Sequence, residues 1–124
     1  RSPGHVYSLE VIRQLVSFSM DNLERTGHLD RVTVIHADGS LGYREKQPYD
    51  RMVVTAASPV VPSPLIEQLR DGGRLLIPLE RGFFMQELYL VEKKKGREVR
   101  TALMPVAFVP LRGQYGSKPQ RPTQ

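Results

Sequence analysis

Two acidic residues directly follow runs of strand-forming residues, a position from which side chains often reach a ligand. Glu10 follows the run at residues 6–9, and Asp38 follows the run at residues 32–36. In open α/β sheets ligands bind beyond the carboxyl ends of the strands, where an acidic side chain can accept hydrogen bonds from ribose hydroxyls. Gly39, next to Asp38, allows a ligand to approach the backbone closely. Each carboxylate also has a structural interpretation, in which Glu10 stands at a helix entry and Asp38 forms an Asx turn. From position alone, the ligand-binding and the structural interpretation of each residue stay open.

The remaining reactive residues do not support nucleophilic or metal-dependent catalysis. His5, His28 and His36 do not have the spacing of metal ligands, and the sequence has no cysteine. His36 lies near Asp38, but a single histidine at a strand end is interpreted as a structural or surface residue. Ser40 stands in Asp-Gly-Ser-Leu-Gly and lacks the Gly-x-Ser-x-Gly frame of a nucleophile elbow. The sequence therefore predicts neither covalent nor metal catalysis.

The first elements of the chain must position the two carboxylates. A strand at residues 6–9 ends on Glu10, and residues 11–25 then show the spacing of a helix. Thr26-Gly27 is a predicted stop signal for that helix, and residues 32–36 are apolar and β-branched, as in a strand. The predicted helix has one apolar face, formed by Ile12, Leu15, Val16, Ser19 and Leu23. A strand, a helix and a strand in this order predict a βαβ unit.

The second half of the chain changes character after Pro78. Before it we expect a strand at 51–55 covered on both faces, a short helix at 64–69, a tight turn at 71–73 and a strand at 74–78. After it, residues 86–92 and 99–111 read as an antiparallel pair joined at 93–96, with Pro105 at an edge or bulge. The fold class is therefore α/β, with a mostly parallel sheet and a C-terminal antiparallel hairpin. Residues 1–111 are predicted to form part of one domain, and residues 112–124 a flexible tail.

Composition limits the class of protein. A chain of 124 residues with 40% hydrophobic and 25% charged residues is typical of one globular domain, not of a disordered segment. It contains neither an apolar run long enough to cross a membrane nor a signal-peptide pattern, so we expect a soluble, cytoplasmic protein. The net charge of +5 comes partly from a basic cluster and a basic tail, for which a solvated surface is favoured over a nucleic-acid site. These residues are Lys93, Lys94, Lys95, Arg97 and Arg100, then Arg112, Lys118 and Arg121.

Several blocks, in order, closely resemble the protein-L-isoaspartate (D-aspartate) O-methyltransferases. The resemblance extends from His5 to about Leu111, so it covers nearly the whole chain. The blocks are DGSLGY at 38–43, PYDR at 48–51, VTAASP at 54–59, PLIEQL at 64–69, GGRLLIP at 72–78 and FVPL at 108–111.

The resemblance implies an S-adenosylmethionine-dependent enzyme with a Rossmann-like sheet. Glu10 would hold the ribose hydroxyls of the cofactor, with Val11 packing nearby, and Asp38 with Gly39 would meet the adenine. A further segment, at the end of the central strand, would face the cofactor and substrate cleft; its residues are Thr55, Ala56 and Ala57.

The implied substrate is damaged protein that contains L-isoaspartyl or D-aspartyl residues. The resemblance implies a methyl ester product that collapses to a succinimide. Because a carboxylate with a pKa of about 4 is ionised at pH 7, the enzyme needs alignment of the reactants more than a general base.

The sequence departs from the family pattern in two ways. The glycine-rich cofactor loop, its strand and the substrate-gripping segment are expected upstream of His5, together with the catalytic residues. Leu79 and Glu80 stand where the family usually has Val-Gly. With a middle strand missing, we expect the isolated chain to be inactive and either oligomeric, aggregation-prone or dependent on an N-terminal segment. The alternatives are a non-catalytic interaction module of the same fold and a related methyltransferase with another acceptor, including nucleic acid.

Overall fold

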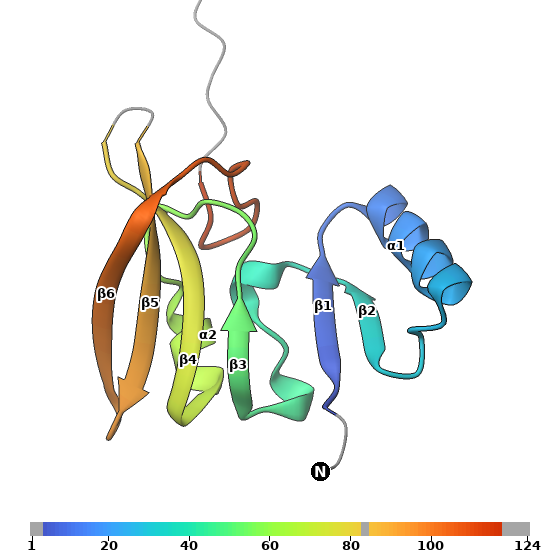
Figure 1. Ribbon diagram of the computed structural model, residues 1–124, viewed down its shortest axis with the longest axis horizontal. Helices are drawn as coiled ribbons and strands as arrows, with labels where there is room; N and C mark the ends of the chain where they lie inside the picture. The colour runs from blue at the N-terminus through green and yellow to red at the C-terminus, as the bar shows by residue number, and fades with distance from the viewer. Residues whose placement is uncertain (1–3, 83–84, 118–124) are drawn as a thin grey trace, which may run out of the picture. The chain divides into compact units, whose positions relative to one another are not determined.

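The computed structural model describes residues 4–82 and 85–117 (Figure 1). The chain divides into two compact units, residues 1–39 and residues 40–124. The first unit has the order β1-α1-β2, and the second has β3-α2-β4-β5-β6. Two short 3-10 helices, Gly39–Leu41 and Arg44–Lys46, precede β3. The predicted order of helices and strands is confirmed.

The first unit is a βαβ unit. β1 (Val6–Glu10) and β2 (Val32–His36) pair in parallel, with Val6 opposite Val32 and Glu10 opposite His36. α1 (Arg13–Thr26) connects the two strands and packs against them (Figure 1). Parallel pairing brings the carboxyl ends of β1 and β2 to the same edge of this sheet.

The ends of α1 have separate local causes. The helix begins two residues later than predicted because Ile12 keeps an extended backbone, with φ −96° and ψ 114°. The Ile12 N–H donates to the Glu10 carboxylate, so this amide is satisfied outside the helix. The predicted stop is confirmed: Gly27 adopts a left-handed φ of 76°, and its N–H donates to the Glu24 carbonyl.

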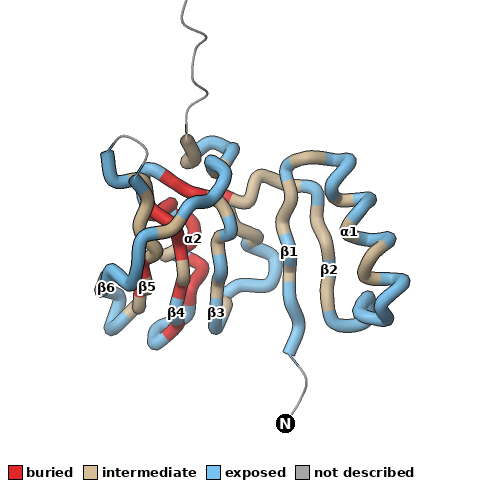
Figure 2. The backbone as a smooth tube through the Cα atoms, turned by 45° about the horizontal axis from the view of Figure 1, so that its top comes forward, coloured by how far each residue is buried: buried red, intermediate tan, exposed pale blue. Residues whose placement is uncertain are grey.

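The inward face of α1 is narrower than predicted. Ile12, Val16, Ser19 and Leu23 are half-buried, whereas Leu15 is 44% exposed. None of the described residues of the first unit is fully buried, as Figure 2 shows by the absence of red on β1, β2 and α1. This unit therefore buries little apolar surface by itself.

The second unit is a four-stranded sheet. Its strands are β3 (Tyr49–Val53), β4 (Leu69–Glu80), β5 (Gln86–Lys94) and β6 (Arg97–Val106), paired in that order. β3 and β4 run parallel, while β4, β5 and β6 run antiparallel to one another. α2 (Ser63–Gln68) connects β3 to β4, and the predicted turn between β5 and β6 falls on Lys95 and Gly96, both with positive φ.

Parallel strands followed by an antiparallel end are confirmed, but a mostly parallel sheet is not. Among the described residues two strand pairs are parallel, β1-β2 and β3-β4, and they belong to different sheets. Two further pairs, β4-β5 and β5-β6, are antiparallel. In the described part of the chain, β1 pairs only with β2 and β3 only with β4. The second edges of β1 and β3 therefore have no strand beside them among the described residues.

Several strand boundaries differ from the prediction, three of them by two residues or more at positions that change the interpretation of the sequence. β3 begins at Tyr49 and not at 51, and β6 ends at Val106 and not at 111. β4 begins at Leu69 because the glycine pair at 72–73 forms an irregularity within the strand and not a turn before it. The register with β3 jumps there, and Gly72 takes a φ of 80°. The expected edge or bulge at Pro105 is confirmed, since β6 is an edge strand with a register shift nearby.

The core lies on one face of the second sheet, under α2 (Figure 2). Leu75 and Ile77 of β4 pair with Val91 and Tyr89 of β5, and all four are buried. Leu65 of α2 packs onto this cluster. Burying such side chains stabilises the fold by about 1.5–3 kcal/mol each.

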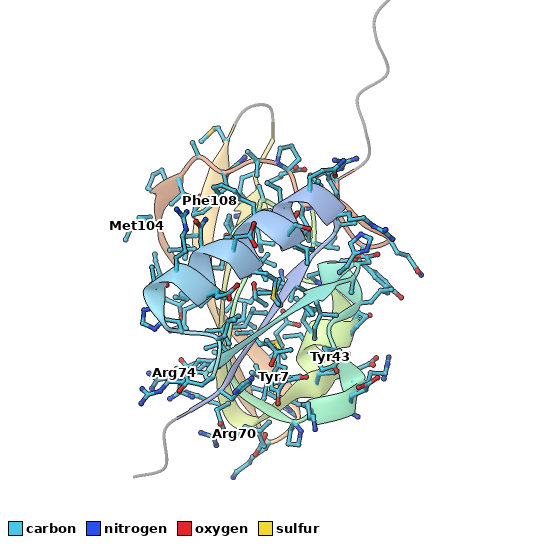
Figure 3. The ribbon with its side chains drawn as sticks, turned by 90° about the vertical axis from the view of Figure 1, so that its right-hand side faces the viewer. Tyr7, Tyr43, Arg70, Arg74, Met104 and Phe108 are labelled. Atoms are coloured by element: carbon cyan, nitrogen blue, oxygen red, sulfur yellow. The ribbon has the colours of Figure 1, made fainter. Side chains whose placement is uncertain are left out.

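The opposite face of the second sheet is exposed at its two outer strands. Val53 of β3 is 67% exposed and Met104 of β6 is 54% exposed. Figure 3 shows Met104 and Phe108 at the opposite end of this sheet from Arg70 and Arg74. The prediction that the third strand is covered on both faces is therefore wrong for the part of the chain that the structure describes.

The segment after β3 joins two other parts of the second unit. The Ala57 N–H donates to the Val109 carbonyl, and the Leu111 N–H donates to the Ala57 carbonyl, both at 2.7 Å. Ser58 makes the same kind of reciprocal contact with the end of β4. Ala57 and Ser58 are consequently buried completely.

The departure from the family pattern at Glu80 is accommodated without strain. Glu80 ends β4 in the extended ladder opposite Gln86, and the left-handed φ of 76° falls on Gly82 instead. The Ser117 hydroxyl donates to the Glu80 carboxylate. Residues 112–117 of the predicted tail are thus hydrogen-bonded to the second unit, and residues 118–124 lie outside the described residues.

Candidate functional site

The paired ends of β1 and β2 place Glu10 and Asp38 at one edge of the first unit. Glu10 lies opposite His36. Beyond this pair, the Ala37 N–H donates to the Glu10 carbonyl at 3.0 Å, where the strands β1 and β2 end. Asp38 follows two residues after His36 and is half-buried, as is Glu10. The structure therefore brings together two of the carboxylates that the sequence analysis selected.

The Glu10 carboxylate combines a structural contact with a free acceptor. Its Oε1 accepts the Ile12 N–H at 3.1 Å, so the helix-entry interpretation is supported. Within the described residues the second oxygen has no hydrogen-bond partner, and it can therefore accept a hydroxyl donor from a ligand. Val11, which follows in the turn, is 38% exposed beside it.

The fold around position 39 does not by itself require a glycine there. The φ of Gly39 is not in the left-handed region, and a Cβ added there would meet Leu9 Cβ at 3.7 Å and the Leu9 carbonyl at 3.9 Å. Both distances are ordinary van der Waals contacts. A ligand that approaches the backbone next to Asp38 would supply the missing reason for a glycine here.

His36, which the sequence predicted to be a structural or surface residue, is exposed and contacts the backbone next to Glu10. Its Nε2 lies 3.0 Å from the Val11 carbonyl. Because a carbonyl can only accept, Nε2 carries the proton and donates. The parallel register that sets His36 opposite Glu10 is the signal that could have revealed this contact.

The predicted cleft residues Thr55, Ala56 and Ala57 belong to the second unit. They lie one residue beyond β3, after the carboxyl end of a parallel strand. Thr55 is exposed, Ala56 is half-buried and Ala57 is fully buried in the contact with residues 109–111. Of the three, Thr55 and Ala56 therefore keep solvent-exposed surface.

Gln68, which sequence reasoning did not select, holds the loop that follows the predicted adenine-binding pair. This fully buried side chain donates from Nε2 to the Leu41 carbonyl at 2.9 Å and accepts the Tyr43 N–H at 2.8 Å. Gly42 lies between these two residues with a φ of 69°, and a Cβ there would be 2.2 Å from the Gln68 amide oxygen. A glycine is therefore required at position 42 for both conformation and space.

Other binding features do not coincide with this site. A groove of about 370 Å³ on the first unit is lined by the starts of β1 and β2 and by the second half of α1, at the end of the strands away from Glu10. The described residues contain no group of His, Asp and Glu side chains that could hold a metal ion. In the described ranges, neither helix is long and apolar enough to cross a bilayer.

Comparison with known proteins identifies the family. A sequence model described as protein-L-isoaspartate(D-aspartate) O-methyltransferase (PCMT) matches residues 1–116. The chain belongs to this family. Relatives named protein-L-isoaspartate O-methyltransferase include that of Hyperthermus butylicus, 51% identical over 114 residues, and that of Pyrococcus abyssi, 52% identical over 112 residues. These matches cover 91% and 90% of this chain but 47% and 51% of the relatives.

Solved structures agree with the family assignment. One named protein-L-isoaspartate O-methyltransferase has a TM-score of 0.84 at 31% identity and is matched over 91% of this chain and 36% of its own. Another, named for the same activity, comes from Plasmodium falciparum and is in complex with S-adenosyl-L-homocysteine. It has a TM-score of 0.77 at 31% identity over 87% of this chain and 52% of its own. The chain therefore spans about half the length of the curated relatives that it matches.

Proposed function

We propose that the protein transfers a methyl group from S-adenosylmethionine to the free carboxylate of L-isoaspartyl and D-aspartyl residues in damaged proteins. The observation that carries the proposal is the pair of carboxylates, Glu10 and Asp38, at the joined ends of β1 and β2 in a member of this family. One structural neighbour was solved with S-adenosyl-L-homocysteine, the product that methyl transfer leaves behind.

The cofactor would bind through four residues of the first unit. The unpartnered oxygen of Glu10 would accept hydrogen bonds from the ribose hydroxyls, and the exposed Val11 would pack against the sugar. The Asp38 carboxylate would face the exocyclic amine of the adenine, and Gly39 would let the ring lie close to the backbone. When bound, S-adenosylmethionine supplies an electrophilic methyl group on a sulfonium.

The chemistry requires alignment and little acid–base assistance. A carboxylate oxygen of the substrate forms a bond to the methyl carbon while the carbon–sulfur bond breaks, and both electrons of that bond stay on sulfur. The carboxylate is ionised at pH 7, because its pKa is about 4, so no base has to remove a proton. The residues at 55–57 would contribute by holding the substrate backbone in the orientation for attack.

We also propose that the complete protein forms a single Rossmann-like sheet. One further strand would pair with both β1 and β3, at the edges that have no neighbour among the described strands. Edge strands with unpaired backbone groups are normally paired or covered, which supports this arrangement.

Nucleic acid as the acceptor is less well supported. Lys93 of the basic cluster donates from Nζ to the Ile66 and Leu69 carbonyls at 2.9 and 3.0 Å, and so serves the fold. Arg100 pairs with Glu98 at 2.6 Å. These two cations of the cluster are thus engaged within the protein, which leaves a smaller charge for phosphate contacts.

The proposal is tested with labelled S-adenosylmethionine and two peptides that differ only in an isoaspartyl or an aspartyl residue. We expect the enzyme to label the isoaspartyl peptide and not the aspartyl peptide, and the label to be lost in mild base as methanol. Labelling of nucleic acid in place of the peptide would support the other acceptor class. Because the isolated chain is expected to be inactive, the assay is repeated with the predicted N-terminal segment supplied; absence of both methyl transfer and cofactor binding there would support an interaction module instead.

A further inference from the structure

The turn between β1 and α1 is held by two side chains on the same face of the first sheet. Residues that pair across parallel strands lie on one face, so the side chains of Glu10 and His36 are neighbours. The Glu10 carboxylate accepts the Ile12 N–H from within the turn, and the His36 ring reaches the Val11 carbonyl from the adjacent strand. The two contacts fix consecutive residues of the turn from both sides.

One further contact bounds the turn, because the Ala37 N–H donates to the Glu10 carbonyl at 3.0 Å. The bonds of α1 begin at the Ile12 carbonyl, which accepts the N–H groups of Leu15 and Val16. The Val11 carbonyl lies outside that ladder. Ile12, at the N-cap position, has no side-chain cap, and Val11 itself is 38% exposed. Among the described residues, loss of the His36 contact would therefore leave the Val11–Ile12 peptide held only through its N–H, by the Glu10 carboxylate.

We propose that His36 is a positioning residue for the cofactor site, which orients the Glu10 carboxylate by holding the Val11 carbonyl. This inference rests on the proposed function, because it takes the ribose as the group that Glu10 receives. The donor is available from the imidazolium and from the neutral tautomer protonated on Nε2, so either form can hold the turn. His36 touches neither cofactor nor substrate in this role, and acts only through the turn.

The test compares three single variants of the enzyme by calorimetric titration with S-adenosyl-L-homocysteine. His36→Leu removes the donor, and we expect the affinity to fall about three- to ten-fold, as for the loss of one hydrogen bond. His36→Gln restores an N–H donor at nearly the position of Nε2 and should keep the affinity within about two-fold of the parent. His28→Leu, at an exposed histidine of the same unit whose side chain has no such contact, is the matched control and should leave the affinity unchanged.

A double-mutant cycle separates positioning from a general structural effect. Glu10→Gln keeps an acceptor for the Ile12 N–H but removes the charge that the ribose would meet. If His36 acts through Glu10, His36→Leu should have little further effect in the Glu10→Gln background. Equal effects of His36→Leu in both backgrounds, or failure of His36→Gln to rescue, would overturn the positioning role.

The same titrations distinguish failure of the proposed role of His36 from failure of the proposed cofactor site. A loss of affinity in Glu10→Gln with none in His36→Leu would overturn the role of His36 and leave the cofactor site intact. An unchanged affinity in Glu10→Gln would overturn the cofactor site itself, and the role of His36 with it.

Discussion

The buried amide of Gln68 makes a stability contribution that can be calculated from the structure. Replacing it in Gln68→Met keeps a side chain of similar length but removes the donor to the Leu41 carbonyl and the acceptor for the Tyr43 N–H. A polar group left without its partner costs about 1–3 kcal/mol. Leu41 is 38% exposed, so water can partly replace the donor there, and we expect a total loss of about 2–4 kcal/mol.

The assay is urea denaturation followed by far-ultraviolet circular dichroism. A loss of about 2–4 kcal/mol is a large part of the 5–15 kcal/mol that typically stabilises a domain, so the midpoint should move clearly to lower urea. Gln14→Met, the same substitution at an exposed position of α1, is the control and should change stability by less than about 0.5 kcal/mol. If Gln68→Met were no more destabilising than Gln14→Met, the two hydrogen bonds would not be what holds the 41–43 loop.

Three further substitutions test other parts of the structure. Gly42→Ala should destabilise by about 2–4 kcal/mol in the same urea assay, because its Cβ would collide with Gln68 and its φ is left-handed. Gly39→Ala should leave the urea midpoint unchanged, because the added methyl group makes only ordinary contacts with Leu9. It should weaken S-adenosyl-L-homocysteine binding about ten-fold in calorimetry, because in the proposed site the methyl group would lie against the adenine; an unchanged affinity would argue against contact at Gly39. Lys93→Met should cost about 1–2 kcal/mol in urea, because Nζ caps the carbonyls at the end of α2, whereas the exposed Lys95→Met should not be destabilising.

Elements with strong local signals could be predicted from the sequence. The strand Val32–His36 has the expected bounds because a β-branched run is closed on both sides by polar or turn-forming residues. The end of α1 follows from Gly27, and the turn of the last hairpin from Gly96. The placement of Glu10 and Asp38 at one edge could also be predicted, since it requires only that two strands be parallel neighbours.

Features that depend on distant residues could not be predicted. A pair of glycines indicates a turn and a bulge equally well, and only the pairing with β3 shows that Gly72 lies within β4. The contact of Lys93 with α2 spans 24 and 27 residues, and that of His36 with Val11 spans 25. No local pattern marks such partners. The division of the parallel strands between two sheets likewise depends on which strands find a neighbour, a non-local property.

The central claim is that the first unit binds S-adenosylmethionine through its two strand-end carboxylates. The most direct measurement is calorimetric titration of the enzyme with S-adenosylmethionine, comparing Asp38→Ala with Glu45→Ala. Glu45 is an exposed carboxylate nearby in sequence whose Oε2 accepts the Tyr43 hydroxyl at 2.7 Å, so it controls for the loss of a charge. Loss of one hydrogen bond to a charged group costs about 1.5–3 kcal/mol, so Asp38→Ala should weaken binding about ten-fold or more and Glu45→Ala should not. Equal affinities of the two variants would contradict the claim and remove Asp38 from the site.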